Sequence, residues 1–312
     1  MVPAAQSTRW RFFRYTGWDA LVVLGGLAQF SLVVGGLVFY PVLPIWALVL
    51  IGFVQAWSIC WNLQSVSHNF IHNPFFAWEP LNRLWGVIET IELGVPHMIY
   101  HHFHMNHHFG DNDKIGPNGT TKDWSSTYRY GKNDQPEAFL SYVLLSFFRT
   151  ELTPAWIVIK KHGPRHVHQL IIESIALAGF LVAALCLHWQ FVVFVYLPSF
   201  YVGWVLSYAE GYVEHHDTIP GNPLANSVSS YHWLYNLTWF NNGYHQEHHW
   251  DPKCHWTKIP KLSEELRPRL IENGTRMIKG PHMLIFLEDW WNGRKPRSAV
   301  AVVSAPDEKK AA

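Results

Sequence analysis

Three short histidine-rich segments have the spacing of metal-binding helices. The first is an HxxxH pattern and the other two are HxxHH patterns; together they contain His68, His72, His104, His107, His108, His245, His248 and His249. Residues at i, i+3 and i+4 share one face of a helix, so each segment would point its imidazoles at one place. Neutral imidazole binds iron, copper, nickel and zinc. Eight such ligands exceed the needs of one tetrahedral zinc ion, so the spacing predicts most of the ligands for two metal ions.

Acidic residues close to these segments are candidates for supporting the ligands. A metal-bound histidine usually donates its second N–H to a carboxylate or a carbonyl, and Asp111, Asp113, Glu214 and Glu247 could accept it. For Asp111 and Asp113 a solvated loop charge is an equal alternative. Glu247 lies at i+2 within its segment and points away from the ligand face, which favours a supporting role over ligation. We expect no catalytic residue beyond the metal ligands.

Composition points to a membrane protein. Of the 312 residues, 49% are hydrophobic and 16% aromatic, but only 15% are charged. The net charge of +1 gives no reason to expect a nucleic-acid partner. The cysteines, Cys60, Cys186 and Cys254, are far apart and lie outside the histidine segments. This pattern argues against a disulfide framework and against a thiolate zinc site.

Long apolar runs predict an all-α membrane protein with four transmembrane helices and a cytoplasmic helical cap that carries the histidine segments. About 20 apolar residues span the ~30 Å hydrocarbon layer. The predicted transmembrane helices cover residues 18–40, 43–63, 169–187 and 191–210, and the cap covers 64–168 and 211–292.

Shorter apolar stretches lie within the cap, at residues 84–100 and 138–148. They predict helices that lie at the membrane interface or under the cap. We expect a single domain over residues 1–292 and a disordered tail over residues 293–312.

The distribution of positive charge predicts the topology. The two predicted outer turns, residues 41–44 and 188–190, contain none of the 24 lysines and arginines. Positive charge favours the cytoplasmic side, and an even number of spans puts all other segments on that side. We therefore expect an integral membrane protein with the active site and both termini in the cytoplasm.

A ninth metal ligand is expected just after the last apolar run, at the same membrane depth as the first histidine segment. His215 is our first choice and His216 is the alternative. Glu214 could itself ligate, because iron accepts carboxylates as well as imidazoles. Most of the remaining histidines are expected to be ordinary surface or core residues.

The three histidine segments resemble those of the membrane fatty-acid desaturase superfamily, over roughly residues 20–260. This resemblance implies four spans, a cytoplasmic cap, and a non-haem centre of two ferrous ions that uses O₂ as co-substrate. It also implies a ninth histidine between the second and third segments, which supports His215. Residues 242–249 are similar to the third segment of sphingolipid desaturases and carotenoid ketolases. Residues 212–215 resemble a segment of membrane alkane hydroxylases.

These resemblances leave the reaction open. Desaturation of a fatty-acyl or sphingolipid-type chain is the first prediction, and hydroxylation or ketolation of alkyl chains or carotenoids is the alternative. A histidine-rich metal transporter would place its ligands near the bilayer midplane, whereas these histidines lie outside the predicted spans. No haem-binding cytochrome domain or flavin fingerprint is evident in the sequence. A separate electron donor, a ferredoxin or a cytochrome-type carrier, is therefore expected beside the lipid substrate.

Overall fold

The computed structural model describes residues 11–294. The tail predicted for residues 293–312 lies outside the described residues except for Gly293 and Arg294. The guanidinium of Arg294 donates to Asp217 Oδ2 at 3.0 Å. Arg294 lies beyond the predicted domain end at residue 292 but still contacts the predicted cap.

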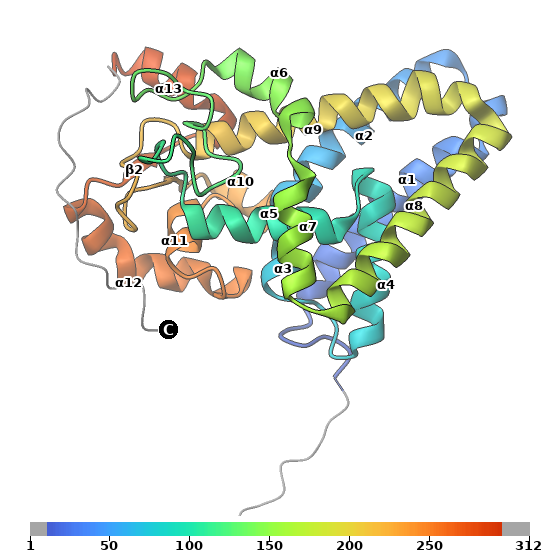
Figure 1. Cartoon of the computed structure of the whole chain (residues 1–312), viewed down its shortest axis with the longest axis horizontal. Coiled ribbons are helices and arrows are strands. Elements are labelled where there is room, and N and C mark those ends of the chain that lie inside the picture. Colours follow the sequence, from blue (N-terminus) through green and yellow to red (C-terminus); the bar gives the residue numbers. More distant parts are fainter. Residues whose placement is uncertain (1–10, 295–312) are drawn as a thin grey trace, which may run out of the picture.

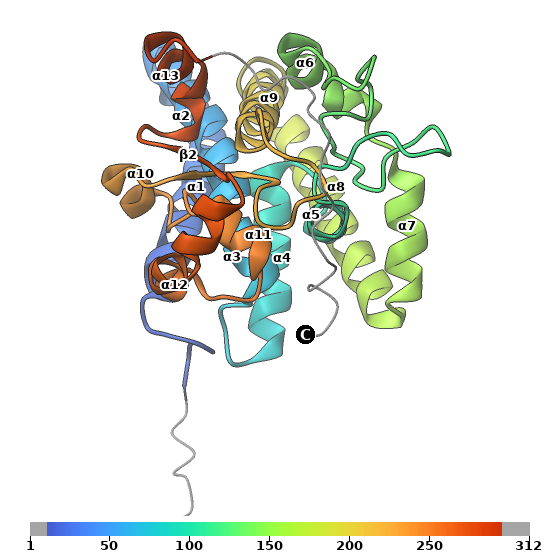
Figure 2. The same cartoon turned by 90° about the vertical axis from the view of Figure 1, so that its left-hand side faces the viewer.

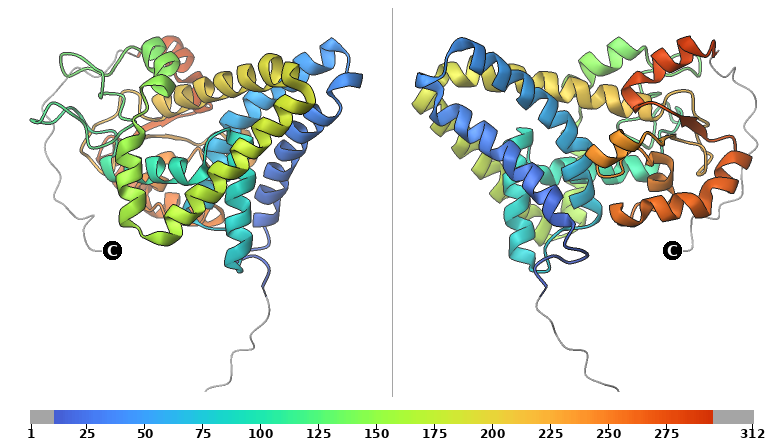
Figure 3. Two further views of the ribbon diagram at one scale, coloured as in Figure 1. Left: turned by 45° about the vertical axis from the view of Figure 1, so that its right-hand side comes forward. Right: turned by 180° about the vertical axis from the view of Figure 1, so that it is seen from behind.

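Two helical hairpins extend to one end of the molecule. The first consists of α1 (Asp19–Val38), the short turn η1 (Tyr40–Val42) and α2 (Ile45–Trp61). The second consists of α8 (Pro164–Phe191), which turns at His188, the π-helix η3 (Val192–Tyr196) and α9 (Leu197–Glu214). Their turns lie together (Figures 1 and 3). The ring of Tyr40 in the first turn is 5.6 Å from the ring of His188 in the second.

Within residues 11–294, three helical stretches are long and apolar enough to cross a membrane: Asp19–Val38, Ile45–His72 and Pro164–Glu214. As one straight helix the 51 residues of the last would be about 76 Å long, more than twice the hydrocarbon thickness. The backbone breaks at His188 (φ −149°, ψ 78°), where the sequence predicted a turn, so this stretch forms two arms. The bent pair α6 (Phe139–Arg149) and α7 (Leu152–Lys161) passes the same test only when taken together.

The second apolar helix does not end at residue 63, where the sequence predicted the end of a span. It continues through a π-helical turn, η2 (Asn62–Val66), into α3 (Ser67–His72). The helix stops only at Asn73, because Pro74 disfavours helical geometry in the residue before it. The first histidine segment is therefore continuous with the second apolar helix.

The predicted cap corresponds to the segment between the hairpins and the segment after them. The first segment contains α4 (Glu79–Leu93), α5 (His97–Gly110), α6 and α7, and the second contains α10 (Trp233–Thr238), α11 (His245–Trp250), η4 (Trp256–Lys258), α12 (Ile259–Glu272), η5 (His282–Leu284) and α13 (Ile285–Trp291). Helices α4, α5 and α6 lie where the shorter apolar stretches predicted helices. Figure 2 shows α3, α5 and α11 side by side at the centre of the molecule.

The molecule is mostly helical but not all-α. Two three-residue strands, β1 (Val228–Ser230) and β2 (Arg276–Ile278), pair in parallel with Val228 opposite Arg276. Strands this short show no alternating apolar pattern, and their pairing joins segments far apart in the sequence, so the sequence did not predict them.

Close packing of α2 against α9 sets the distance between the first histidine segment and His215. A Cβ atom at Gly203 would lie 2.6 Å from Ile59 Cβ and 2.9 Å from the Ala56 carbonyl oxygen. Only glycine allows this approach. Helix α2 leads into α3, and α9 ends just before His215, so the contact brings both ends toward α5.

Candidate metal centre

Nine histidines converge into two groups at the centre of the molecule. We call them the five-histidine group and the four-histidine group; within each, one ring nitrogen of every histidine lies within 4.8 Å of the others. The first contains His68, His72, His104, His108 and His248, and the second contains His107, His215, His245 and His249. These are the nine residues that the sequence singled out.

The second and third histidine segments each contribute to both groups. Helix α5 directs His104 and His108 into the five-histidine group but His107 into the four-histidine group. Helix α11 divides its histidines similarly, with His248 in the first group and His245 in the second. Two short helices therefore hold the two groups at a fixed separation.

The inward nitrogens of the five-histidine group lie close together. The Nε2 atoms of His68 and His248 are 2.6 Å apart, and those of His72 and His104 are 2.8 Å apart. His108 Nε2 is 2.9 Å from His104 Nε2 and 3.0 Å from His248 Nε2. Two imidazole nitrogens that each lie about 2.1 Å from one ion, at right angles, are about 3.0 Å apart. The spacing therefore fits ligands that share one metal ion.

The inward nitrogens of the four-histidine group also lie close together. His215 Nε2 is 2.9 Å from His107 Nε2 and 3.4 Å from His245 Nε2, and His249 Nε2 is buried without a hydrogen-bond partner in the described chain. Burial lowers the pKa of the His108 and His249 imidazoles well below their usual value, and neighbouring imidazoles lower it further. Neutral rings are the form that a metal ion requires.

The outward nitrogens of several histidines have acceptors, which fixes the ring orientation. His107 Nδ1 is 2.7 Å from Asp123 Oδ2, and His249 Nδ1 is 3.1 Å from Asp111 Oδ1. His215 Nδ1 is 2.8 Å from the Asn226 carbonyl oxygen. When Nδ1–H donates to such an acceptor, the lone pair of Nε2 points inward as a ligand.

The four acidic candidates differ in what they contact. Asp111 accepts from His249, and its left-handed backbone (φ 56°) ends α5 at this point. Glu214 Oε1 is 3.6 Å from His245 Nδ1, which is longer than a hydrogen bond. The carboxylate of Asp113 accepts from the backbone N–H groups of Lys122 and Asp123, so it holds the loop that carries Asp123.

Glu247 points away from both groups, as its position in the segment predicted. Its carboxylate accepts hydrogen bonds from the hydroxyls of Ser229 (2.5 Å), Tyr231 (2.9 Å) and Ser263 (2.6 Å). These bonds anchor α11 to β1 and α12. His216, the alternative ninth ligand, belongs to neither group, because its ring packs on Phe286 and its Nε2 lies 3.8 Å from Asp289 Oδ2.

Two residues of the site were missed by the sequence analysis. Asp123 follows His107 by 16 residues in an irregular loop, and no local pattern marks it. His282 is fully buried beside Glu210 and Glu214. Burial lowers the pKa of His282, but the two carboxylates outweigh this effect and raise it to about 9.

Replacing Asp123 by asparagine should weaken metal binding. The amide keeps the size of the side chain but removes the charge that faces His107, and a change behind a ligand typically costs about 10–100-fold in metal affinity. Iron retention against a competing chelator measures the effect. Asp134→Asn is the control, because this aspartate is exposed and contacts Lys114. Equal retention by the Asp123 variant and the parent protein would show that the carboxylate does not support His107.

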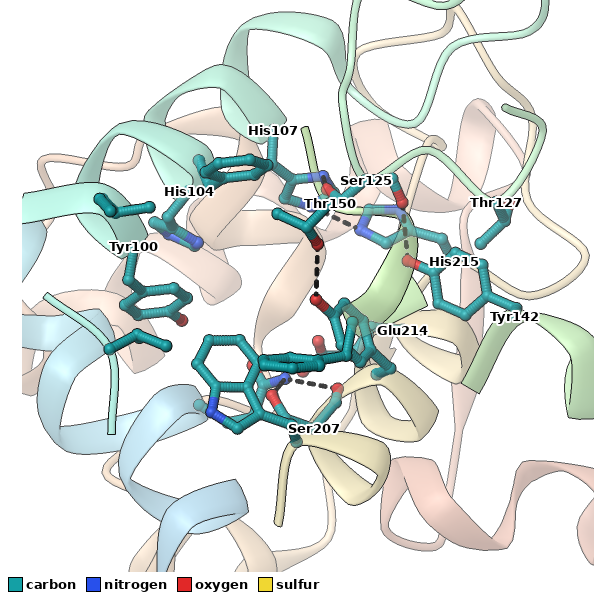
Figure 4. A pocket seen from close by; sticks show the side chains of 18 of the residues that line it. Tyr100, His104, His107, Ser125, Thr127, Tyr142, Thr150, Ser207, Glu214 and His215 are labelled. Atoms are coloured by element: carbon teal, nitrogen blue, oxygen red, sulfur yellow. Dashed lines mark hydrogen bonds between the residues drawn. The ribbon is translucent and has the colours of Figure 1, made fainter. Parts of the chain in front are cut away.

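A cavity of about 330 Å³ opens directly onto the histidines (Figure 4). It lies between α5, α6 and α9 and reaches His104, His107, His215 and His245. Its walls are largely aromatic and aliphatic, including Tyr100, Phe103, Ile99, Phe147, Trp204 and Tyr208. This volume suits a small-molecule or chain-like ligand.

Comparison with known proteins identifies the family. The family model described as fatty acid desaturase matches residues 41–281. The chain is 27% identical over 213 residues to a sphingolipid delta(4)-desaturase DES1-like protein of Oryza sativa subsp. japonica, covering 68% of this chain and 62% of that protein. It is 26% identical over 219 residues to the sphingolipid delta(4)-desaturase of Candida albicans, covering 62% and 55%.

The matched part therefore spans less than two thirds of the length of these relatives. No solved structure matches the chain. The family match covers most of the chain and contains all nine converging histidines. The chain belongs to the fatty acid desaturase family.

Proposed function

We propose that this protein is a membrane-bound di-iron enzyme that desaturates a fatty-acyl or sphingolipid-type chain with O₂. The observation that carries the proposal is the apolar cavity whose wall includes histidines of both groups, such as His104 and His215. In this reaction two hydrogen atoms leave adjacent carbons. With O₂, two electrons and two protons, the products are an alkene and two water molecules.

Each histidine group would hold one iron ion. Nine inward imidazole nitrogens fit two ions, and imidazole is a suitable ligand for iron. When bound, the two ferrous ions would supply the reduction of O₂ and the oxidising power for an unactivated C–H bond. Asp123 and Asp111 keep the Nδ1–H of His107 and His249 pointing outward.

The cavity walls position the acyl chain. Phe103, Phe147 and Trp204 offer apolar contact to methylene groups and exclude water, while the chain passes His104 and His215. Hydroxylation or ketolation at the same site is the alternative, because the outcome depends on the placement of the reacting carbon to within about an ångström. The relatives named as sphingolipid delta(4)-desaturases support desaturation.

Expression in a host with defined lipids, followed by mass spectrometry of the acyl chains, tests the function. Desaturation removes two hydrogen atoms and lowers the product mass by about 2 Da, whereas hydroxylation raises it by about 16 Da. The product should be absent from a His104→Ala variant. A product heavier by one oxygen atom, with no alkene, would favour the alternative reaction.

The electron donor is proposed to be a separate ferredoxin or cytochrome-type carrier, and the chain is proposed to form one domain over residues 1–292. The four apolar arms would cross the membrane, with the two adjacent turns outside and the histidines and both termini in the cytoplasm. The absence of Lys and Arg from both turns supports this orientation.

Reporter fusions test this topology. Reporters placed after Ala312 and within residues 115–135 should give a cytoplasmic signal. One inserted near Gln190 should give an external signal, because residues 188–190 lie at the turn of the second hairpin, beside the turn of the first. A cytoplasmic signal at Gln190 would contradict four spans.

A further inference from the structure

A third group of potential ligands lies beside the four-histidine group but outside both histidine groups. Glu210 and Glu214 stand one turn apart on α9, and His282 approaches them from η5. One ligand atom from each lies within 4.8 Å of the others. We call these three residues the carboxylate cluster. Glu210 and His282 are completely buried and Glu214 is 2% exposed.

The distances in the carboxylate cluster fit an ion pair and also fit ligands that share one metal ion. His282 Nδ1 is 3.5 Å from Glu210 Oε1 and 3.6 Å from Glu214 Oε1. Such separations are too long for good hydrogen bonds. Two ligand atoms that each lie about 2.1 Å from one ion at a tetrahedral angle are about 3.4 Å apart.

His282 is oriented as a metal ligand would be. Its Nε2 lies 3.1 Å from the Val228 carbonyl oxygen and donates its hydrogen there, which turns Nδ1 toward the carboxylates. Nδ1 also lies 3.2 Å from the Tyr235 hydroxyl. A ligating histidine typically donates its other N–H in this way.

The carboxylates are held from behind as well. The Tyr235 hydroxyl donates to Glu210 Oε1 at 2.6 Å, and Asn242 Nδ2 donates to Glu214 Oε1 at 2.8 Å.

Two buried polar atoms around the cluster have no hydrogen-bond partner within residues 11–294. One is Glu210 Oε2. The other is Nδ1 of His245, a side chain only 2% exposed, which faces Glu214 Oε1 at 3.6 Å. Buried polar atoms are normally paired, so these two indicate that a further group belongs here.

The charges also favour a divalent cation. Two carboxylates share one buried site. A divalent ion neutralises both and leaves His282 neutral, as a ligand must be.

We propose that Glu210, Glu214 and His282 form a third metal site, which binds a divalent first-row transition ion. Two carboxylate oxygens and one imidazole nitrogen are a donor set for ferrous, manganous or zinc ions. The site goes beyond the proposed two-iron centre and contains none of the nine histidines. His245 stands between the two metal sites, with Nε2 toward the four-histidine group and Nδ1 toward Glu214.

Counting metal ions in the full-length protein tests this site. The parent protein and its variants are purified in detergent, stripped of metal, loaded anaerobically with Fe²⁺, desalted, and measured for iron per chain. The parent protein should hold one ion more than His282→Ala and Glu210→Gln. Glu210→Gln keeps the shape of the side chain and the acceptor for Tyr235, so it remains informative if the alanine variant does not fold.

His255→Ala is the matched control, since this buried histidine also faces a buried carboxylate, Asp19 Oδ1 at 3.0 Å, but is paired with no second carboxylate within residues 11–294. It should bind as many ions as the parent protein. A double variant, His215→Ala with His282→Ala, should lose two ions, one from each site. Unchanged iron in both Glu210→Gln and His282→Ala would overturn the third site and leave the two-iron proposal intact. A loss of two or more ions in Glu210→Gln would also overturn it, because the site would then not be separate.

Discussion

Replacing His215 by alanine is expected to lower the iron content by about one ion per chain and to abolish turnover. His215 Nε2 lies 2.9 Å from His107 Nε2 and 3.4 Å from His245 Nε2, so its removal leaves three imidazoles in the four-histidine group. The ring also borders the cavity, where the reacting carbon would lie. Iron per chain and product formation, measured on the same preparation, check both parts of the prediction.

His216→Ala is the matched control, because it removes the neighbouring histidine without touching either group. The His216 ring packs on Phe286, and its Nε2 faces Asp289 at 3.8 Å. This variant should keep its iron and measurable activity. Glu214→Gln should keep the two irons of the histidine groups, with activity lowered about 10–100-fold, as for other groups behind metal ligands. Full iron and normal turnover in His215→Ala, with iron lost from His216→Ala, would reverse our assignment of the ninth ligand.

Helical spacing was enough to find the histidines but not to divide them between two groups. Successive residues of a helix are about 100° apart around its axis, so His107 and His108 point in directions about 100° apart. The spacing is therefore consistent with His107 and His108 belonging to different groups. Which group each histidine joins depends on how α3, α5 and α11 are placed around one centre, and other helices separate them along the chain.

The apolar runs predicted the hairpins because a membrane-type helix is marked locally, by composition and length. The break at His188 and the helices at the shorter stretches were recognised in the same way. The sequence did not show that the second helix continues to His72. A helix can change from apolar to polar without a helix-breaking residue, and the first such residue here is Pro74.

The residues that support the ligands were the hardest to predict. Asp123 meets His107 across 16 residues of α5 and loop, and His282 meets Glu214 across the whole third histidine segment. Contacts of this kind depend on tertiary folding, and one sequence contains no period or spacing that records them. For the same reason, the sequence left a supporting role for Asp111, which contacts His249, and a solvated loop charge as equal alternatives.

Placing a phenylalanine at Gly211 is expected to block substrate oxidation while leaving the metal centre intact. Gly211 lies on α9 at the wall of the cavity, and a Cβ atom added there meets no other atom within 4 Å. An aromatic ring can therefore enter the cavity without displacing backbone. It would occupy the space that the acyl chain needs beside His215 and His245, and misplacing a substrate by an ångström can already cost about 100-fold in rate.

Gly179→Phe is the matched control for this variant. Gly179 is also a helical glycine with open space around an added Cβ, but it lies on α8 and does not line the cavity. We expect Gly179→Phe to keep its iron and its activity, and Gly211→Phe to keep its iron but to lose at least about 100-fold in kcat/KM. Chelator-resistant iron and product yield give the two measurements. If Gly211→Phe oxidised long acyl chains at the parental rate, the substrate would have to reach the histidines by another route, and the cavity between α5, α6 and α9 would not be the substrate site.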